Sequence, residues 1–252
     1  MMKNILLKIS YDGTDFSGWQ RQPDKRTVCG ELEALLERLL GEEIVLNGTS
    51  RTDSGVHAYG QCASFRADLK MPTENLVKMM NDALSEDRLE SIGDIRIISA
   101  TEMPDDFHAR FSSKGKTYIY RIKNVNEPNV FDKNYFYQVS GNLDIGKMKR
   151  AAEFLVGEHD FAAFQSSGSP KESTVRTIYD LTVDANGNDI TVTISGNGFL
   201  YNMVRIIVGT LVEAGLGKIN PTDVKIMLES CDRSTAGHTA PPQGLYLSEI
   251  YF

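Results

Sequence analysis

Hydrophobic and polar residues follow two periods along the first hundred positions, and the alternation predicts a regular order of strands and helices. Stretches with a period of two predict strands, and apolar residues spaced three and four apart predict amphipathic helices. The predicted strands cover residues 4–10, 43–48, 58–66 and 95–101, and the predicted helices cover residues 27–40 and 73–84. The order is therefore βαββαβ.

The second part of the chain repeats this order and adds a helix. Strands are predicted over residues 116–123, 177–184, 189–195 and 244–251, and helices over residues 144–156, 200–216 and 221–229. This repeat predicts an α+β fold of two tandem ferredoxin-like halves, residues 1–103 and 104–252. We expect the halves to form a joined antiparallel sheet with helices on one face and a central cleft.

Composition indicates a folded, soluble protein, since 41% of the 252 residues are hydrophobic and 24% are charged. No apolar run approaches the roughly 20 residues that a membrane-spanning helix needs. The first residues lead directly into strand-like alternation instead of the long apolar stretch of a signal peptide. We therefore expect a cytoplasmic location and no contact with a membrane.

The formal net charge of −7 weakly disfavours nucleic acid as a partner, because proteins that bind phosphates are usually basic. Basic residues nevertheless gather in two places. One group is Arg21, Lys25 and Arg26, and the other is Arg110, Lys114, Lys116, Arg121 and Lys123. Either group is compatible with scattered solvated charges or with a local surface for phosphates.

Candidate chemistry centres on Asp53, which lies in the segment SRTDSGVHAYGQ between two predicted strands. An aspartate in such a loop caps its own turn in many proteins, so Asp53 alone does not indicate catalysis. His57 follows four positions later, and a hydrogen bond that supports the fold is the favoured interpretation. The histidines and the three cysteines lack the spacing of metal sites, and no nucleotide-binding glycine loop is present. The pattern indicates chemistry without a metal or cofactor.

Further segments agree in order with one known family. The segment RTDSGVHA resembles the RTDxGVHA signature of the TruA-type tRNA pseudouridine synthases. The other blocks that resemble this family are YDGTDFSGWQRQ, FHARFSS followed by KTYIYRI, GEHDFAAF, TVRTI, GFLYNMVRIIVGTL and APPQGLYL. The resemblance covers nearly the whole chain.

The resemblance implies an isomerase that converts uridine to pseudouridine at nucleotides 38, 39 and 40 of the tRNA anticodon stem-loop, acting as a homodimer. Asp53 in the first half would be the nucleophile. Tyr118 in the second half would stack on the target base, and Arg205 would face Asp53. Arg51 would hold or replace the extruded nucleotide. Arg21, Arg110 and Lys116 would contact the RNA.

Two of these assignments have alternatives in the residues themselves. Tyr118 alternates with Tyr120, as half-buried tyrosines of a sheet do. Arg205 lies in the apolar run FLYNMVRIIVGTL, where a cation needs a partner. Other readings of the chain are the same reaction on another RNA, a non-catalytic RNA-binding module, and, less favoured, a hydrolase using Asp53 and His57.

The chain also departs from the family pattern near its central aspartate. Thr49 and Ser50 stand where small residues including glycine are usual, Ser54 stands where alanine is common, and Lys116 replaces a frequent arginine. These departures leave the reacting groups in place and bear on the choice of RNA substrate.

Overall fold

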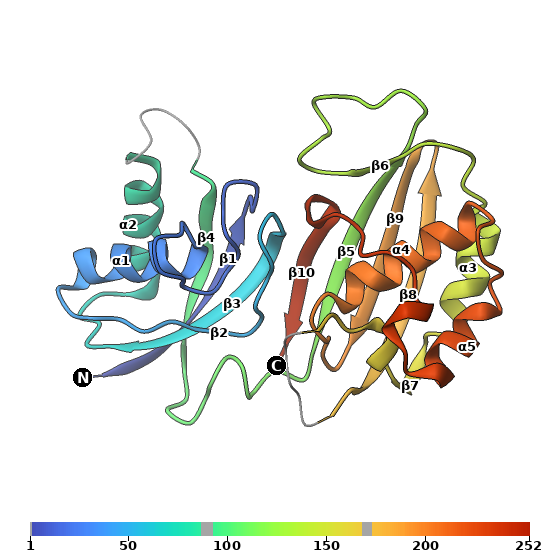
Figure 1. Cartoon of the computed structure of the whole chain (residues 1–252). Helices are drawn as coiled ribbons and strands as arrows, with labels where there is room; N and C mark the ends of the chain where they lie inside the picture. Colours follow the sequence, from blue (N-terminus) through green and yellow to red (C-terminus); the bar gives the residue numbers. More distant parts are fainter. Residues whose placement is uncertain (1, 87–92, 168–172) are drawn as a thin grey trace. The chain divides into compact units, whose positions relative to one another are not determined.

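The computed structural model describes residues 2–86, 93–167 and 173–252, which form two compact units (Figure 1). The first unit contains the chain up to Lys114 together with Leu247–Phe252, and the second contains Gly115–Tyr246.

The sheet of the first unit has the strand order β4-β1-β3-β10. Strand β1 (Lys3–Tyr11) runs antiparallel to both β3 (His57–Ala67) and β4 (Ile95–Met103). Strand β10 covers Leu245–Tyr251, and its residues from Leu247 onward belong to this unit. The short strand β2 (Asn47–Gly48) pairs with β3.

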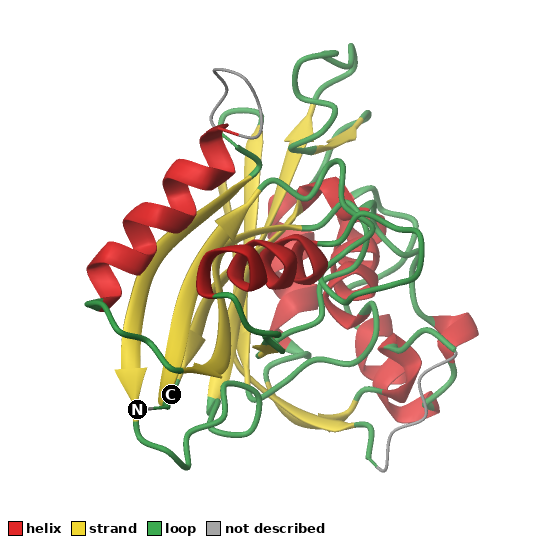
Figure 2. Ribbon diagram, turned by 90° about the vertical axis from the view of Figure 1, so that its left-hand side faces the viewer, coloured by secondary structure: helices red, strands yellow, loops and turns green. Residues whose placement is uncertain are grey.

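Two helices pack against this first sheet. Helix α1 (Val28–Leu40) begins after Thr27, whose side chain accepts a hydrogen bond from the backbone N–H of Gly30. Helix α2 (Thr73–Glu86) contacts α1 and strand β4. Figure 2 shows both helices beside the strands of this unit. The buried face of α1 carries apolar side chains at three- and four-residue spacing, namely Val28, Leu32, Leu35 and Leu36.

The second unit has an antiparallel sheet in the order β5-β9-β8-β7, and β6 pairs in parallel with β5. Its strands are β5 (Gly115–Asn124), β6 (Tyr137–Val139), β7 (Gly157–Asp160), β8 (Val175–Asn186) and β9 (Asp189–Gly196). Its helices are α3 (Ile145–Glu153), α4 (Met203–Gly215) and α5 (Asp223–Ser230), with short 3-10 turns at Ala162–Phe164, Arg233–Thr235 and Pro242–Gly244. Figure 1 shows the three α-helices over one face of this sheet.

The predicted α+β class and the tandem ferredoxin-like arrangement are confirmed, and the structure corrects individual elements. The predicted strand over residues 43–48 shrinks to Asn47–Gly48, because only these residues pair with β3. Strands β6 and β7 were not predicted, since three and four residues are too few to show a period. The joined sheet and the cleft remain predictions.

The division of the chain also differs from the predicted boundary after residue 103. The FHARFSS segment stays with the first unit because its backbone bonds to β1 and β3. The side chain of Asn4 donates to the carbonyls of Pro104 and Phe107, and the N–H of Ala109 donates to Ser64 Oγ. The end of the chain returns to this unit, where the Lys114 N–H donates to the Tyr251 carbonyl.

Among the residues that the structure describes, no helix is long and apolar enough to cross a membrane. Within the same residues, no three His, Cys, Asp or Glu side chains form a group that could hold a metal ion.

Candidate active site

The segment before β3 carries Asp53, and its first residues are fixed by β3 itself. Gln61 is completely buried, and its amide nitrogen donates to the Ser50 carbonyl at 2.8 Å while its oxygen accepts from the Ser50 N–H at 3.4 Å. Thr49 is held at both ends, since its N–H donates to Cys62 and its hydroxyl donates to the Ala109 carbonyl. The Gln61 side chain thus extends the β2–β3 pairing to within three residues of Asp53.

A second loop, residues 12–19, packs against the other side of this segment. The N–H of Trp19 donates to the Thr52 carbonyl at 3.1 Å, and the N–H of Gly55 donates to the Phe16 carbonyl at 3.3 Å. The Ser54 hydroxyl donates to the same Phe16 carbonyl at 3.2 Å. Since these bonds reach the residues directly before and after Asp53, the loop fixes the backbone from which the carboxylate projects.

Two glycines permit this close approach of backbone to backbone. A Cβ atom on Gly13 would lie 2.0 Å from the Val56 carbonyl oxygen, and one on Gly18 would lie 2.6 Å from the Thr52 carbonyl oxygen. Gly18 also has a φ of +88°, a conformation that residues with a side chain rarely adopt. The YDGTDFSG block therefore serves as a support for the RTD segment.

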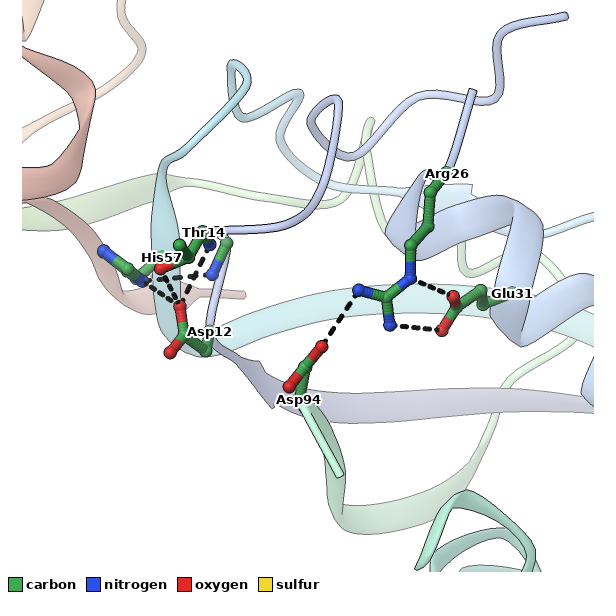
Figure 3. A network of polar contacts seen from close by, with 7 residues as sticks. Asp12, Thr14, Arg26, Glu31, His57 and Asp94 are labelled. Atoms are coloured by element: carbon green, nitrogen blue, oxygen red, sulfur yellow. Dashed lines mark hydrogen bonds and ion pairs between the residues drawn. The ribbon is translucent and has the colours of Figure 1, made fainter. Parts of the chain in front are cut away.

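His57 has the structural role that its sequence position indicated. Its ring is buried, and its Nδ1 accepts a hydrogen bond from the Gly13 N–H at 3.0 Å (Figure 3). Asp12 Oδ1 lies 3.1 Å from the same nitrogen and also accepts from the N–H and hydroxyl of Thr14. These contacts tie the start of loop 12–19 to the start of β3.

Asp53 itself is half-buried, between a buried Thr52 and an exposed Ser54. The Thr52 hydroxyl shares a 2.7 Å hydrogen bond with the hydroxyl of Tyr11, and both residues are buried. Arg51 is exposed. The arrangement presents one carboxylate on a turn whose neighbouring residues are hydrogen-bonded to loop 12–19, with a cation two residues away in sequence.

Tyr118 lies on β5 in the second unit, where its ring meets the ring of Phe199 edge-on at a centroid distance of 5.3 Å. Only 8% of the residue is exposed, so an aromatic edge is held in place without being fully covered. Lys116 is half-buried on the same strand two positions earlier, and it therefore lies on the same face of the sheet.

Arg205 projects from α4 and is oriented by main-chain and amide oxygens. Its Nε donates to the Ala240 carbonyl at 2.7 Å, and its Nη1 donates to Asn202 Oδ1 at 2.8 Å. The Ala240 N–H returns a bond to the Arg205 carbonyl. These bonds join the APPQGLYL block to the FLYNMVR block.

The charge of Arg205 acts on the phenol of Tyr120. Burial raises the pKa of Tyr120 well above its usual range, although the Arg205 charge lowers it. The neutral phenol donates to the Pro241 carbonyl at 2.6 Å. Tyr120 is therefore a structural partner of the APPQGLYL block that orients Arg205.

The predicted RNA-contacting residues differ in how they are held. Arg21 is exposed and lies 3.8 Å from Glu33, and Arg110 is exposed with its guanidinium 5.7 Å from the Phe111 ring centroid. Three other members of the two basic groups are engaged inside their units. Arg26 binds Glu31 and Asp94, Lys123 binds Asp132, and the Arg121 guanidinium lies over Phe136. The two basic groups therefore offer fewer cations for phosphate contacts than the sequence indicated.

Asp53, Arg51 and Arg21, predicted in the first half, lie in the first unit, and Arg110, predicted in the second half, also lies in the first unit. Tyr118, Lys116 and Arg205 lie in the second unit. Their catalytic and RNA-binding roles, and the pairing of Asp53 with Arg205, remain predictions. The supporting residues Gly13, Gly18, Gln61 and Asn202 were not singled out, although each lies inside a quoted block.

Comparison with known proteins adds an independent finding. A family described as tRNA pseudouridine synthase matches residues 8–112 and 151–252. A tRNA pseudouridine synthase A of Thermoanaerobacter sp. (strain X514) is 47% identical over 251 residues, covering 100% of both chains. The protein of the same name from Caldicellulosiruptor bescii and the tRNA pseudouridine synthase A 2 of Clostridium perfringens are each 43% identical with the same coverage.

Proposed function

Because the chain belongs to the tRNA pseudouridine synthase family, we propose that it modifies nucleotides 38, 39 and 40 of the anticodon stem-loop with Asp53 as nucleophile. The enzyme is an isomerase that forms pseudouridine in tRNA. The role of Asp53 as nucleophile is supported by the hydrogen bonds that hold the residues around it. Hydrogen bonds reach the residues on both sides of it, while its side chain stays half-buried. Such rigid support suits a reacting group, because small displacements of one are costly.

The reaction breaks the bond between ribose C1′ and uracil N1 and makes a bond between C1′ and C5. N1 gains a proton and C5 loses one, so the base changes its attachment without an oxidant, reductant or added atom. A carboxylate serves this change either by attacking C1′ or by attacking C6 of the base. Both routes require Asp53 to be ionised.

Arg205 is proposed to keep Asp53 ionised. An adjacent guanidinium favours the charged form of a carboxylate and opposes the effect of desolvation. The bonds of Arg205 to Ala240 and Asn202 use two of its five N–H donors and fix the direction of the planar group. A lysine would carry the charge without that fixed geometry.

Tyr118 is proposed to stack on the extruded base. A uridine in a paired stem or stacked loop must leave its neighbours at a cost of a few kcal/mol, and an aromatic ring offsets part of that cost. Its edge-on contact with Phe199 holds the ring in one orientation. The phenol is also a candidate for removing the C5 proton.

Docking of the tRNA is proposed to use Arg21, Arg51, Arg110 and Lys116 through phosphate contacts. Their exposed or half-buried positions suit such contacts. Affinity should then fall steeply with salt despite the acidic net charge. We also propose that the enzyme acts as a homodimer, which the family resemblance implies.

One experiment separates this proposal from its alternatives. Unmodified tRNA transcripts are incubated with the wild-type protein, with Asp53→Asn, or with Asp15→Asn, and pseudouridine is mapped at nucleotide resolution. Asp15 is exposed in the supporting loop, so its variant is matched in chemistry and lies outside the site. We expect modification at nucleotides 38, 39 and 40 with the wild type and Asp15→Asn, and none with Asp53→Asn.

Other outcomes distinguish the remaining readings. Pseudouridine at different nucleotides would redirect the proposal to another RNA target. RNA binding without any pseudouridine would indicate a non-catalytic module. An active Asp53→Asn variant would remove the nucleophile from the proposal.

A further inference from the structure

Arg26 lies at the centre of a network that joins three elements of the first unit (Figure 3). Its Nη1 donates to Asp94 Oδ2 at 2.9 Å, and its Nε and Nη2 both donate to the carboxylate of Glu31. Glu31 belongs to α1, and Asp94 directly precedes β4. Two carboxylates thus hold one guanidinium in a fixed plane.

The guanidinium of Arg26 lies over the ring of Phe16. The Arg26 Cζ lies 4.0 Å from the centroid of the Phe16 ring, well inside the range of a cation–π contact. Phe16 is only 2% exposed. A backbone hydrogen bond also connects loop 12–19 to Arg26, since the Ser17 N–H donates to the Arg26 carbonyl at 2.8 Å. Loop 12–19 is therefore fastened to the helix and to the β4 edge through Arg26.

The far end of this chain of contacts is the turn after Asp53. The Phe16 carbonyl accepts from the Gly55 N–H at 3.3 Å and from the Ser54 hydroxyl at 3.2 Å. Asp94 supports the same loop a second time, since its carbonyl accepts from the Asp12 N–H at 2.8 Å. A displacement of Phe16 would consequently move the residues that follow Asp53.

The surroundings of Arg26 do not suit a phosphate. Burial lowers the pKa of Arg26, but the bonds to Glu31 and Asp94 outweigh it and raise the pKa above its usual value. The two carboxylates give the cluster a net negative charge, and the Arg26 side chain is 29% exposed. An RNA backbone would be repelled here, although the sequence placed Arg26 in a basic group.

We propose that Arg26 is a positioning residue for the reaction, which holds the Asp53 turn in its productive geometry through Phe16. The inference rests on the proposed role of Asp53. It assigns Arg26 to the rate of isomerisation and not to tRNA affinity.

The test measures single-turnover pseudouridine formation and the Kd for tRNA in matched variants. Arg26→Ala should lower the rate on the order of 10²-fold, the effect of misplacing a reacting group by about 1 Å, with a Kd within about twofold of the wild type. Arg26→Lys keeps the charge but lacks the planar group, and it should recover part of the rate. Lys3→Ala removes the exposed ion pair with Glu102 in the same unit and should leave both values unchanged.

A double-mutant cycle with Ser54→Ala separates positioning from general destabilisation. If Arg26 acts through the Phe16 carbonyl, the effects of Arg26→Ala and Ser54→Ala on the logarithm of the rate are non-additive, because both changes loosen one contact chain. Where Arg26→Ala does not fold, Arg26→Lys replaces it in the cycle. Additive effects, a wild-type rate, or a weakened Kd with an unchanged rate would overturn the inference.

Failure of the inference can be told apart from failure of the proposed function. Wild-type protein and Asp53→Asn are measured in parallel. An active wild type and an inactive Asp53→Asn variant, together with a normal rate for Arg26→Ala, would reject only the positioning role. An active Asp53→Asn variant would reject the nucleophile on which that role depends.

Discussion

Gly18 and Gly41 share an unusual backbone conformation, and comparing them isolates the contact beside Asp53. Their φ values are +88° and +75°. A Cβ atom on Gly18 would lie 2.6 Å from the Thr52 carbonyl oxygen and 3.1 Å from the Asp53 carbonyl carbon, whereas one on Gly41 would meet nothing within 4 Å. Alanine at either position therefore introduces the same kind of backbone strain, but only Gly18→Ala also collides with the turn that carries Asp53.

The expected losses of stability follow from the backbone strain at both positions and from the additional collision at Gly18. A residue with a side chain in the left-handed region costs about 1 kcal/mol, which is the whole cost expected for Gly41→Ala. Overpacking adds about 1–3 kcal/mol, and the group that must yield at Gly18 is backbone. We therefore expect Gly18→Ala to destabilise the protein by about 3 kcal/mol. If the Thr52 carbonyl retreats by about 1 Å, Asp53 moves with it and the rate falls on the order of 10²-fold.

The assay combines urea denaturation with single-turnover pseudouridine formation, measured where both variants are folded. Gly41→Ala should lower the denaturation midpoint slightly and leave the rate unchanged, while Gly18→Ala should lower both. Equal destabilisation by the two variants, or a wild-type rate for folded Gly18→Ala, would refute the argument that this contact fixes the Asp53 turn.

Three further predictions concern the second unit. Arg205→Lys should lose most pseudouridine formation, since an ammonium cannot keep the planar bonds to its neighbours, and near-normal turnover would remove the proposed geometry. Tyr118→Phe should keep pseudouridine formation if the ring only stacks, and a loss measured by nucleotide mapping would assign the hydroxyl to proton removal. Burial raises the pKa of Glu213, but hydrogen bonds from His238 outweigh it, and the pKa in the folded protein lies below the usual 4.5. The resulting stability is present above that value and lost as the pH falls through the folded pKa. His238→Ala removes the ring contact with Glu213 but keeps the backbone N–H that also donates to it, so the acid limb of a stability profile measured by denaturation should become less steep, and an unchanged acid limb would contradict this.

The long elements of the fold could be predicted because each carries a complete period. Helix α1 shows its buried face in the spacing of Val28, Leu32 and Leu36, and its first residue follows a capping threonine as expected. Residues 43–46 misled the same reasoning, since Ile44 and Leu46 are buried as in a strand but make no ladder with β3. The alternation of apolar and polar residues there reflects the burial of Ile44 and Leu46, whereas pairing with β3 begins at Asn47.

The site was predictable only in part, because sequence shows which residues are unusual and not which ones they touch. Asp53 was found through the motif that contains it. Arg26 was grouped with neighbouring cations, since its partners Glu31 and Asp94 are 5 and 68 positions away along the chain. The bond from Gln61 to Ser50 was equally invisible, because a buried glutamine has no period that would reveal its partner.

The antiparallel course of the two loops explains why the YDGTDFSG and RTDSGVHA blocks occur together. As the first loop advances from Gly13 to Gly18, its contacts move back from Val56 to Thr52, so that Asp53 lies between the two places of closest approach. The departure at position 54 fits this arrangement. An alanine there would leave the Phe16 carbonyl its bond from the Gly55 N–H, and the serine adds a second donor to the same oxygen. Ser54 thus adds a hydrogen bond between the Asp53 turn and loop 12–19. We therefore expect a change at position 54 to affect the rigidity of the Asp53 turn more than the choice of RNA substrate.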